Sequence, residues 1–145
     1  MLILDTNVLS ALMQRDPDRA AAVWLDGQPA VSVWTTAISV LELRVGIELL
    51  DPSRRRGALQ LGLRRLLGEV LEGRVLPFDT EAATEAGRLM AARRRAGQAG
   101  DLRDTMIAGI AITQRATIAT ANLRHFADLP VPVVNPWQPR RTDPA

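Results

Sequence analysis

The sequence predicts an α/β domain in which helices cover a mostly parallel sheet. Short apolar runs that fit buried strands alternate along the chain with longer segments of helical periodicity. The strand candidates are continuously apolar, a pattern typical of parallel strands that are covered on both faces. A length of 145 residues suits one domain, which we expect to span residues 1–135.

Predicted helices dominate the first half of the chain. Asp5 ends a first apolar strand, and either Thr35 or Thr36 has the side chain of a helix N-cap. A later Leu- and Arg-rich segment repeats its apolar residues at helical spacing. In order, the predicted elements are strand 2–4, helix 7–13, helix 19–26, strand 31–33, a helix from the Thr pair to about residue 50, and helix 54–71.

The second half of the chain carries three predicted strands and two predicted helices. Asp79 opens a helix that Gly97 ends, and Asp101 opens the next helix. The predicted elements are strand 75–76, helix 80–95, helix 101–114, strand 117–119 and strand 133–134. Residues 136–145 form a Pro-rich tail that we expect to fray, with Trp137 as the one side chain suited to hold it against the domain.

Composition excludes several classes of protein. The chain has no Cys, so thiol catalysis, disulfide frameworks and zinc fingers are excluded. No apolar run reaches the length of a membrane span, and the N-terminus lacks the basic region of a secretory signal. We therefore expect a cytoplasmic protein without membrane contact. The only His, His125, has no G-x-S-x-G turn to accompany it, so acid–base and metal chemistry fall mainly on carboxylates.

Asp5 is the first candidate site residue. It directly follows a buried strand, and ligand sites in open α/β sheets lie at the carboxyl ends of the strands. Thr6 and Asn7 beside it offer further oxygen ligands or helix-capping groups. The alternative is that Asp5 only caps the helix that begins at Asn7.

Glu42 is the second candidate, on the predicted helix that follows the Thr pair. Ile38, Val45 and Leu49 fall at helical spacing from Glu42, so we expect it to share their inward face. A carboxylate turned toward a core is costly unless it is paired or bound to a cation. The alternatives are a salt bridge to an Arg and a rim position that is open to water.

Asp104 is the third candidate. Ile107, Ala108 and Ala111 lie at i+3, i+4 and i+7 from it, so Asp104 falls on the small, apolar face of its helix. Acidic residues are also favoured in the first turn by the helix dipole. We expect Asp101 to be the N-cap and Asp104 to point toward the sheet, with the reverse assignment left open.

The three carboxylates are far apart in sequence, and the predicted fold can bring them together. Clustered carboxylates repel one another unless a cation neutralises them, and hard oxygen ligands select Mg²⁺ or Mn²⁺. Such a cation activates water and stabilises charge on a phosphodiester. Asp5, Glu42 and Asp104 therefore predict a metal-dependent nuclease.

Five stretches of sequence carry a family resemblance: MLILDTNVLSAL, TTAISVLELRVGI, DLRDTMIAGIAI, TIATANLRHF and VVNPW. In residue types, order and spacing they resemble the PIN-domain proteins, and in particular the FitB-like branch of the VapC-type toxins. The resemblance covers nearly the whole chain, although the segment from about Pro52 to Leu71 carries no signature.

The resemblance implies a three-layer α/β/α sandwich and a Mg²⁺- or Mn²⁺-dependent endoribonuclease, the toxin of a toxin–antitoxin pair. It also implies a homodimer and a small DNA-binding antitoxin that blocks the site, with a higher assembly on operator DNA. The family's catalytic, metal-binding acids correspond to Asp5, Glu42 and Asp104. Thr6 or Asn7, and Thr120, correspond to polar positions near the metal.

The chain departs from the family at the fourth acid. Many PIN nucleases carry this acid in a pattern such as T-x-D or T-x-N-x-x-D-F, where this sequence has Asn122 and His125 at the two candidate positions. Neither residue is acidic, so we expect one bound metal ion and not two. As a lone His near the site, His125 could donate a proton, but a surface or capping role is favoured.

Arginine runs are the candidates for contact with RNA. All eighteen basic residues are Arg, which a GC-rich coding bias explains more simply than function does. Arg93, Arg94 and Arg95 lie shortly before Asp101, so this run is expected to border the site and to follow an RNA backbone. The other two runs, 54–56 and 64–65, fit solvated helix faces better.

Two other functions fit the sequence less well. The missing fourth acid suggests a regulatory protein of weak nuclease activity that acts in complex with a DNA-binding antitoxin. A phosphohydrolase with Asp5 as its nucleophile needs a second Asp two residues further on, and the chain has Asn7 there.

Overall fold

The computed structural model describes residues 1–138 of the chain. Most of the expected tail, 136–145, therefore lies outside the described residues, but Trp137 lies within them. Its indole Nε1 donates to Oδ1 of Asp18 at 3.0 Å, and its ring packs against an apolar core. Trp137 is thus attached to the domain, as the sequence suggested. Within residues 1–138, no helix is long and apolar enough to cross a membrane.

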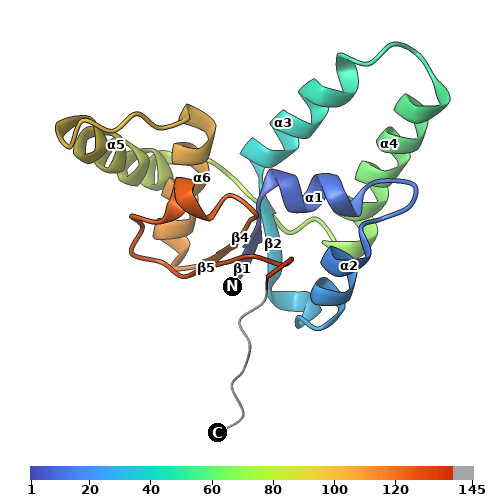
Figure 1. Cartoon of the computed structure of the whole chain (residues 1–145), viewed down its shortest axis with the longest axis horizontal. Coiled ribbons are helices and arrows are strands. Elements are labelled where there is room, and N and C mark those ends of the chain that lie inside the picture. Colours follow the sequence, from blue (N-terminus) through green and yellow to red (C-terminus); the bar gives the residue numbers. More distant parts are fainter. Residues whose placement is uncertain (139–145) are drawn as a thin grey trace, which may run out of the picture.

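Along the described residues, a pair of α-helices lies between each two successive strands among the first four (Figure 1). The strands are β1 (Leu2–Leu4), β2 (Val33–Thr36), β3 (Val75–Leu76), β4 (Thr117–Ala119) and β5 (Val133–Val134). The α-helices are α1 (Thr6–Leu12), α2 (Arg19–Asp26), α3 (Ala37–Glu48), α4 (Arg54–Arg65), α5 (Thr80–Arg95) and α6 (Leu102–Gln114). Shorter turns are the 3₁₀ segments Ala30–Ser32 and Leu123–Phe126 and the π segment Leu66–Val70.

The five strands form one sheet in the order β3-β2-β1-β4-β5, and every pairing is parallel. Strand β1 is central, with Ile3 opposite Trp34 on one side and opposite Ile118 on the other. Because the strands are parallel, the carboxyl ends of β1, β2 and β4 open on the same edge of the sheet. The predicted mostly parallel sheet is confirmed.

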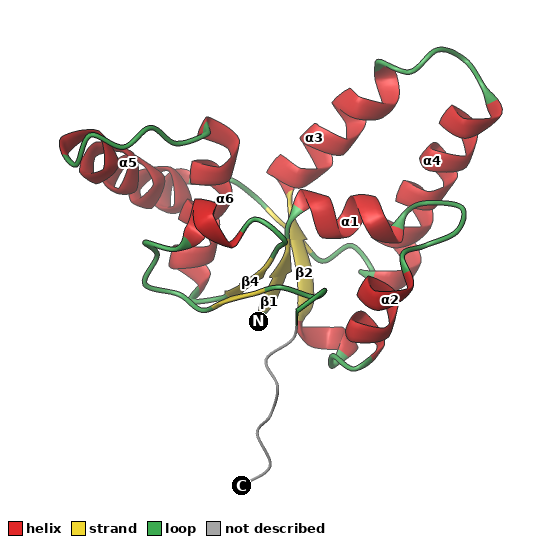
Figure 2. Cartoon of the chain, viewed as in Figure 1, coloured by secondary structure: helices red, strands yellow, loops and turns green. Residues whose placement is uncertain are grey.

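The sheet separates two apolar cores, with helices on both faces (Figure 2). On one face, Leu2 and Leu4 pack with residues of α1, α3 and α4. On the other face, Ile3 packs with residues of α5 and α6. Successive strand residues point to opposite faces, so the three residues of β1 contribute to both cores. The expected three-layer α/β/α arrangement is confirmed.

The predicted strand 31–33 is wrong in its position. Val31 is exposed on the 3₁₀ segment that follows Pro29, and strand β2 begins only at Val33. The strand continues instead through the two threonines, because their β-branched side chains are fully buried. Thr36 is then the N-cap of α3, and its Oγ1 accepts from the Ser39 N–H at 3.1 Å.

The predicted helix 54–71 is divided in the structure. Helix α4 ends at Arg65, and the chain continues as the π segment, in which the Leu71 N–H donates to the Leu66 carbonyl at 2.9 Å. Glu72 and Gly73 then adopt positive φ values of 48° and 75°, which end the helical path. Nothing in the apolar spacing indicates this local change of winding.

Helices α5 and α6 pack against each other at close range. A Cβ built on Gly109 of α6 would lie 2.4 Å from the Ala82 carbonyl oxygen and 2.8 Å from the Ala86 Cβ, both on α5. Only a residue without a side chain permits this approach. The pair therefore forms a closely packed layer on one side of the sheet, and α6 carries Asp104 at its N-terminal end.

Candidate active site

Asp5 lies at the carboxyl end of β1, where it is only 2% exposed. Its Oδ1 accepts from the Thr6 N–H at 2.8 Å and so caps α1, while its Oδ2 accepts from the Thr120 hydroxyl at 2.7 Å. Asp5 therefore both caps α1 and lies at the end of a strand. Burial raises the pKa of Asp5, and the nearby charge of Asp104 raises it further, against the lowering effect of the hydrogen bonds.

Glu42 is placed differently from the prediction. Val45 and Leu49 are 44% and 80% exposed, so the inward face expected for Glu42 is wrong in these two positions. The buried face of α3 runs instead through Ile38, Leu43 and Ile47. The side chain of Glu42 lies at the rim of this face and is 19% exposed, which is the rim alternative left open from the sequence.

Glu42 is turned toward the site by a contact with α1. The Thr6 hydroxyl donates to its Oε1 at 3.0 Å and also lies 3.0 Å from the Ser39 Oγ. Burial raises the pKa of Glu42, and the charges of Asp5 and Asp104 act in the same direction. The three carboxylates are therefore close enough to repel one another.

Asp104 lies in the first turn of α6, after an N-cap at Asp101, as the sequence favoured. Asp101 is the N-cap, and its Oδ1 accepts from the backbone N–H groups of Arg103 and Asp104 at 2.9 and 3.1 Å. Ile107 and Ala108 are fully buried on the face below Asp104. The carboxylate of Asp104 faces the gap at the strand ends, where one of its two oxygens contacts His125.

His125 contacts the third acid. Its Nδ1 lies 2.6 Å from Oδ2 of Asp104, and because a carboxylate only accepts, Nδ1 carries the proton. The imidazole is 53% exposed and sits on the 3₁₀ segment after β4. The surface position that the sequence favoured is correct, but the side chain also belongs to the site.

Polar groups between β1 and β4 complete the surroundings of Asp5. The Asn7 side-chain amide donates to Oδ2 of Asp5 at 3.3 Å and to Thr120 Oγ1 at 3.1 Å, and its Oδ1 accepts from the Ala121 N–H. Asn122 joins through its backbone N–H, which donates to Thr120 Oγ1 at 3.0 Å. Four secondary candidates thus lie in the network around Asp5, whereas Asp101 and His125 contact Asp104: the four are Thr6, Asn7, Thr120 and Asn122.

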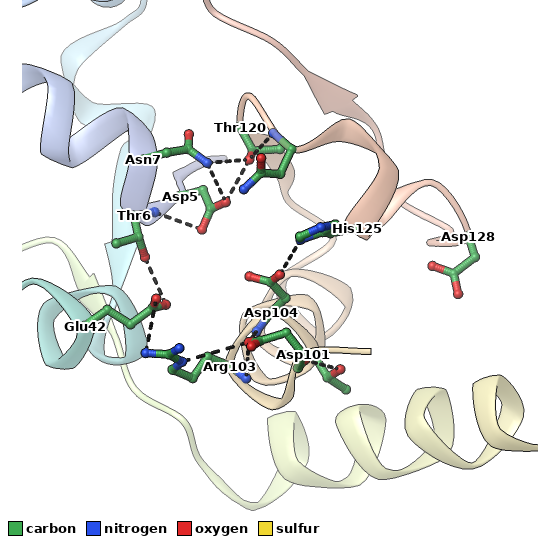
Figure 3. Close-up of polar contacts among 12 residues, drawn as sticks. Asp5, Thr6, Asn7, Glu42, Asp101, Arg103, Asp104, Thr120, His125 and Asp128 are labelled. Atoms are coloured by element: carbon green, nitrogen blue, oxygen red, sulfur yellow. Dashed lines mark hydrogen bonds and ion pairs between the residues drawn. The ribbon is translucent and has the colours of Figure 1, made fainter. Parts of the chain in front are cut away.

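Figure 3 shows the arrangement as a whole: Asp5, Glu42 and Asp104 come from three elements and face the same gap. Among the described residues, no three carboxylate or imidazole groups are grouped closely enough to be a ready-made metal shell. The chemistry of the donors nevertheless fits a hard divalent cation, because all three are carboxylates and two have raised pKa values. Binding would require these side chains to converge.

The prediction for Arg93 needs correction. Arg93 is 8% exposed, and its Nε and Nη2 donate to the two carboxylate oxygens of Asp128 at 2.8 Å each. Further bonds run from Nη1 to Thr105 Oγ1 at 3.2 Å and from Nη2 to the His125 carbonyl at 2.9 Å. With its donors engaged in this way, Arg93 is not available to an RNA backbone. Arg94 and Arg95 are exposed.

Arg93 instead joins the segments that carry the third acid and its histidine. It lies on α5, Thr105 follows Asp104 on α6, and His125 belongs to the 3₁₀ segment. The bidentate bond to Arg93 lowers the pKa of Asp128. The sequence gives no signal for this pairing, because the partners are 35 residues apart and Asp128 lies in a loop.

A second residue that sequence reasoning missed is Arg103. Its Nη1 lies 3.8 Å from Oε2 of Glu42, and its Nε lies 3.9 Å from Oδ1 of Asp101. The guanidinium therefore stands between the acids of α3 and α6 (Figure 3). Its position directly before Asp104 was the available signal.

A cleft adjoins the acids on the side of α6. Its volume is about 460 Å³, and it is lined by both Asp101 and Asp104, together with Gln98, Arg124 and His125. This volume is of the order that small-molecule sites occupy. An extended polar chain that enters the cleft would pass beside Asp104.

A parallel α/β fold with carboxylates gathered at its strand ends is typical of nucleases of the α/β class. The PIN domain family matches residues 2–131 of the chain. Over 96% of its length the chain is 38% identical to the VapC ribonuclease Y4jK of Sinorhizobium fredii, and it covers 99% of that protein. It is 32% identical to the toxin FitB of Neisseria gonorrhoeae, over 94% of this chain and 99% of that one.

Solved structures agree with the sequence relatives. The structure of FitAB bound to an IR36 DNA fragment matches with a TM-score of 0.84 and 29% sequence identity, over 99% of this chain and 100% of the matched chain. The chain therefore belongs to the PIN-domain family, in the VapC branch of ribonuclease toxins from toxin–antitoxin systems.

Proposed function

We propose that this protein is an endoribonuclease that depends on Mg²⁺ or Mn²⁺, with Asp5, Glu42 and Asp104 as the metal ligands. The observation that carries the proposal is that three carboxylates, one directly after β1 and the others on α3 and α6, face one gap at the strand ends. Two of them have pKa values raised mainly by burial, and this is an unfavourable state that a cation would relieve.

The residues of the chain have distinct tasks in this proposal. When bound, the cation supplies charge stabilisation at a phosphodiester and a more reactive water. Thr120 and Asn7 fix the orientation of the Asp5 carboxylate, and Thr6 does the same for Glu42. His125 holds Asp104 through its Nδ1–H. Loss of such a supporting contact typically costs about 10–100-fold in metal affinity or activity.

A single metal ion is part of the proposal. The positions at which many family members carry a fourth acid are Asn122 and His125 in this chain, so the described site offers no fourth carboxylate there. An amide supplies no charge, and His125 is already engaged with Asp104. The three negative charges of the carboxylates exceed the charge of one divalent cation but fall short of the charge of two.

The proposed partners are an antitoxin, a second copy of the chain and operator DNA. Support comes from the FitAB structure, in which a protein similar to this chain is part of a complex on DNA. A protein of this type needs an inhibitor in its own cell if it cleaves cellular RNA. The small DNA-binding protein expected from the sequence fills this role in the proposal.

Matched variants on α3 test the nuclease proposal. Glu42→Gln should lower cleavage of labelled RNA in Mn²⁺ by about 100-fold or more, because a ligand matters more than its supporting contacts. Glu48→Gln changes an exposed carboxylate on the same helix and should keep wild-type activity. Cleavage that persists in Glu42→Gln, or in excess EDTA, would contradict the proposal.

The second candidate function is that of a regulatory protein of weak nuclease activity that works only in complex with the antitoxin. The absence of an acid at positions 122 and 125 is the observation that favours it. Expression of the chain without its antitoxin separates the two. The nuclease proposal predicts growth arrest that Asp104→Ala relieves, whereas the regulatory alternative predicts normal growth with either chain.

A further inference from the structure

Arg103 is the second residue of α6 and is held loosely beside the acids. Its side chain is 52% exposed, and its distances to Glu42 and Asp101, 3.8 and 3.9 Å, exceed those of hydrogen bonds. Arg93 provides the contrast within the same chain, because it is buried and makes a bidentate pair at 2.8 Å. The guanidinium of Arg103 is therefore free to leave its present position at little cost.

The negative charges around Arg103 explain its position beside Glu42 and Asp101. Asp5, Glu42 and Asp104 face one another across the gap, with Asp101 at its edge. Arg103 lowers the pKa of Glu42, against the larger effect of burial. It thus supplies part of the positive charge that the carboxylates need.

A divalent cation bound at the site would supply this positive charge in place of Arg103. An ion bound between the carboxylates neutralises Glu42 more strongly than a distant, half-exposed guanidinium does. Glu42 can then turn fully toward the ion, since within residues 1–138 its carboxylate has only a hydrogen bond from the Thr6 hydroxyl and a long ion pair with Arg103. Arg103 is left without its partner at the mouth of the site, next to Asp104.

We propose that Arg103 is an exchangeable counter-ion: it pairs with Glu42 in the metal-free protein and, once the cation is bound, binds a phosphate of the RNA backbone. The inference rests on the proposed nuclease function. A planar guanidinium with several donors matches a phosphate group, and its exposure lets the side chain reach a strand that enters the site. The helix position of Arg103 places this contact beside the third acid.

The exchange predicts that one substitution, Arg103→Gln, strengthens Mn²⁺ binding and weakens RNA binding. Arg103→Gln removes a cation that competes for Glu42, so Mn²⁺ should bind the metal-free protein about 2–5-fold more tightly. The same variant should bind RNA about 5–10-fold more weakly when Mn²⁺ is present, because a phosphate contact is lost. The slope of log affinity against log salt should fall by about 0.7, as for one contact to single-stranded RNA.

The experiment uses the whole protein and two probes. Mn²⁺ affinity is measured by calorimetry on protein freed of metal, and RNA affinity by stopped-flow anisotropy of fluorescein-labelled oligouridine before turnover. Arg115→Gln is the control, because it removes the same charge at the opposite end of α6. It should leave Mn²⁺ affinity and the salt slope as in the wild type, and Arg103→Lys should recover much of the RNA affinity.

Each result decides the matter. Tighter Mn²⁺ binding together with weaker, less salt-dependent RNA binding in Arg103→Gln supports the exchange. Unchanged or weaker Mn²⁺ binding, or unchanged RNA binding, overturns it while the nuclease proposal stands, provided the wild type cleaves RNA. A wild type that binds neither Mn²⁺ nor oligouridine overturns the exchange together with the nuclease proposal.

Discussion

Asp5 uses its two carboxylate oxygens for different purposes. One oxygen caps α1 through the Thr6 N–H, and the other faces Thr120 and the site. A shorter or uncharged polar side chain would be a sufficient cap. The buried charge is thus more than the helix needs, and it carries a cost in stability that the proposed cation would offset.

This cost gives a prediction for the metal-free protein. The pKa of Asp5 is raised in the folded state, so between the ordinary and the raised pKa the folded chain binds more protons, and stability falls as pH rises through this window. Asp5→Asn removes the charge and can keep the cap. At pH 7 in EDTA it should therefore raise Tm by about 2 °C or more.

Thermal unfolding at several pH values tests the direction of this pH dependence. The advantage of Asp5→Asn should shrink as pH falls toward the ordinary pKa of an Asp, about 3.9, because the wild-type carboxyl is then neutral as well. A variant that is less stable than the wild type at pH 7 would mean that the lost hydrogen bonds outweigh the relieved burial.

At the scale of residues, the sequence predicted positions that local features determine and missed contacts that depend on the fold. Asp5 and Asp104 were identified from the end of a strand and from the first turn of a helix, which are local features. Glu42 does face the gap, but Val45, three residues further along α3, is exposed, because the buried face of this helix runs through Leu43 and Ile47. The pairs Arg93–Asp128 and Arg103–Glu42 join segments far apart in sequence, and no local pattern contains them.

Helix α6 owes its position to its contact with α5. The close approach at Gly109 and the Arg93 bonds hold α6 at two points, one along its middle and one near its N-terminal end. Asp104 lies next to Thr105, which makes the contact near the N-terminal end. The placement of one catalytic candidate therefore depends on packing residues that have no chemistry of their own.

Gly109→Ala should be strongly destabilising. The added Cβ would meet the Ala82 carbonyl oxygen at 2.4 Å, and backbone cannot move aside as a flexible side chain can. We expect a loss of about 2–3 kcal/mol in the free energy of unfolding, measured in urea. Gly87→Ala, on α5 with open space around it, should instead gain about 0.5–1 kcal/mol. Equal effects of the two substitutions would contradict this account of the helix pair.

The elements themselves were predictable to different degrees. Strands β1, β3, β4 and β5 and helices α2 and α5 have the bounds expected from apolar runs and capping residues. Strand β2 was misplaced because Val31 has a strand former's side chain on an exposed turn. The π segment after α4 has the same composition as a helix and differs only in its winding.

At the scale of the whole molecule, the site lies where two separately packed layers meet. Glu42 belongs to a helix on one face of the sheet, Asp104 belongs to a helix on the other, and Asp5 directly follows the central strand β1. A cation bound to all three would connect both layers through the sheet edge.

Metal binding should therefore be visible as stability of the entire domain. At a Mn²⁺ concentration about 100 times its Kd, we expect the free energy of unfolding to rise by about 2.7 kcal/mol. Differential scanning calorimetry should show a higher Tm that EDTA reverses. The gain should be lost in Asp104→Asn and kept in Glu48→Gln; an equal gain in both variants would indicate that Mn²⁺ binds elsewhere.

The unequal packing of the two helix layers has a mechanical consequence. Asp104 stands on α6, which is fixed to α5 almost backbone to backbone, whereas Glu42 stands on a helix whose outer residues Leu41, Val45 and Leu49 are exposed in the single chain. A shift of α6 would have to disturb this close contact with α5, whereas the outer face of α3 has no such neighbour within residues 1–138. We therefore expect Glu42 to adjust the spacing of the carboxylates when ligands of different bulk enter, while Asp5 and Asp104 keep their positions.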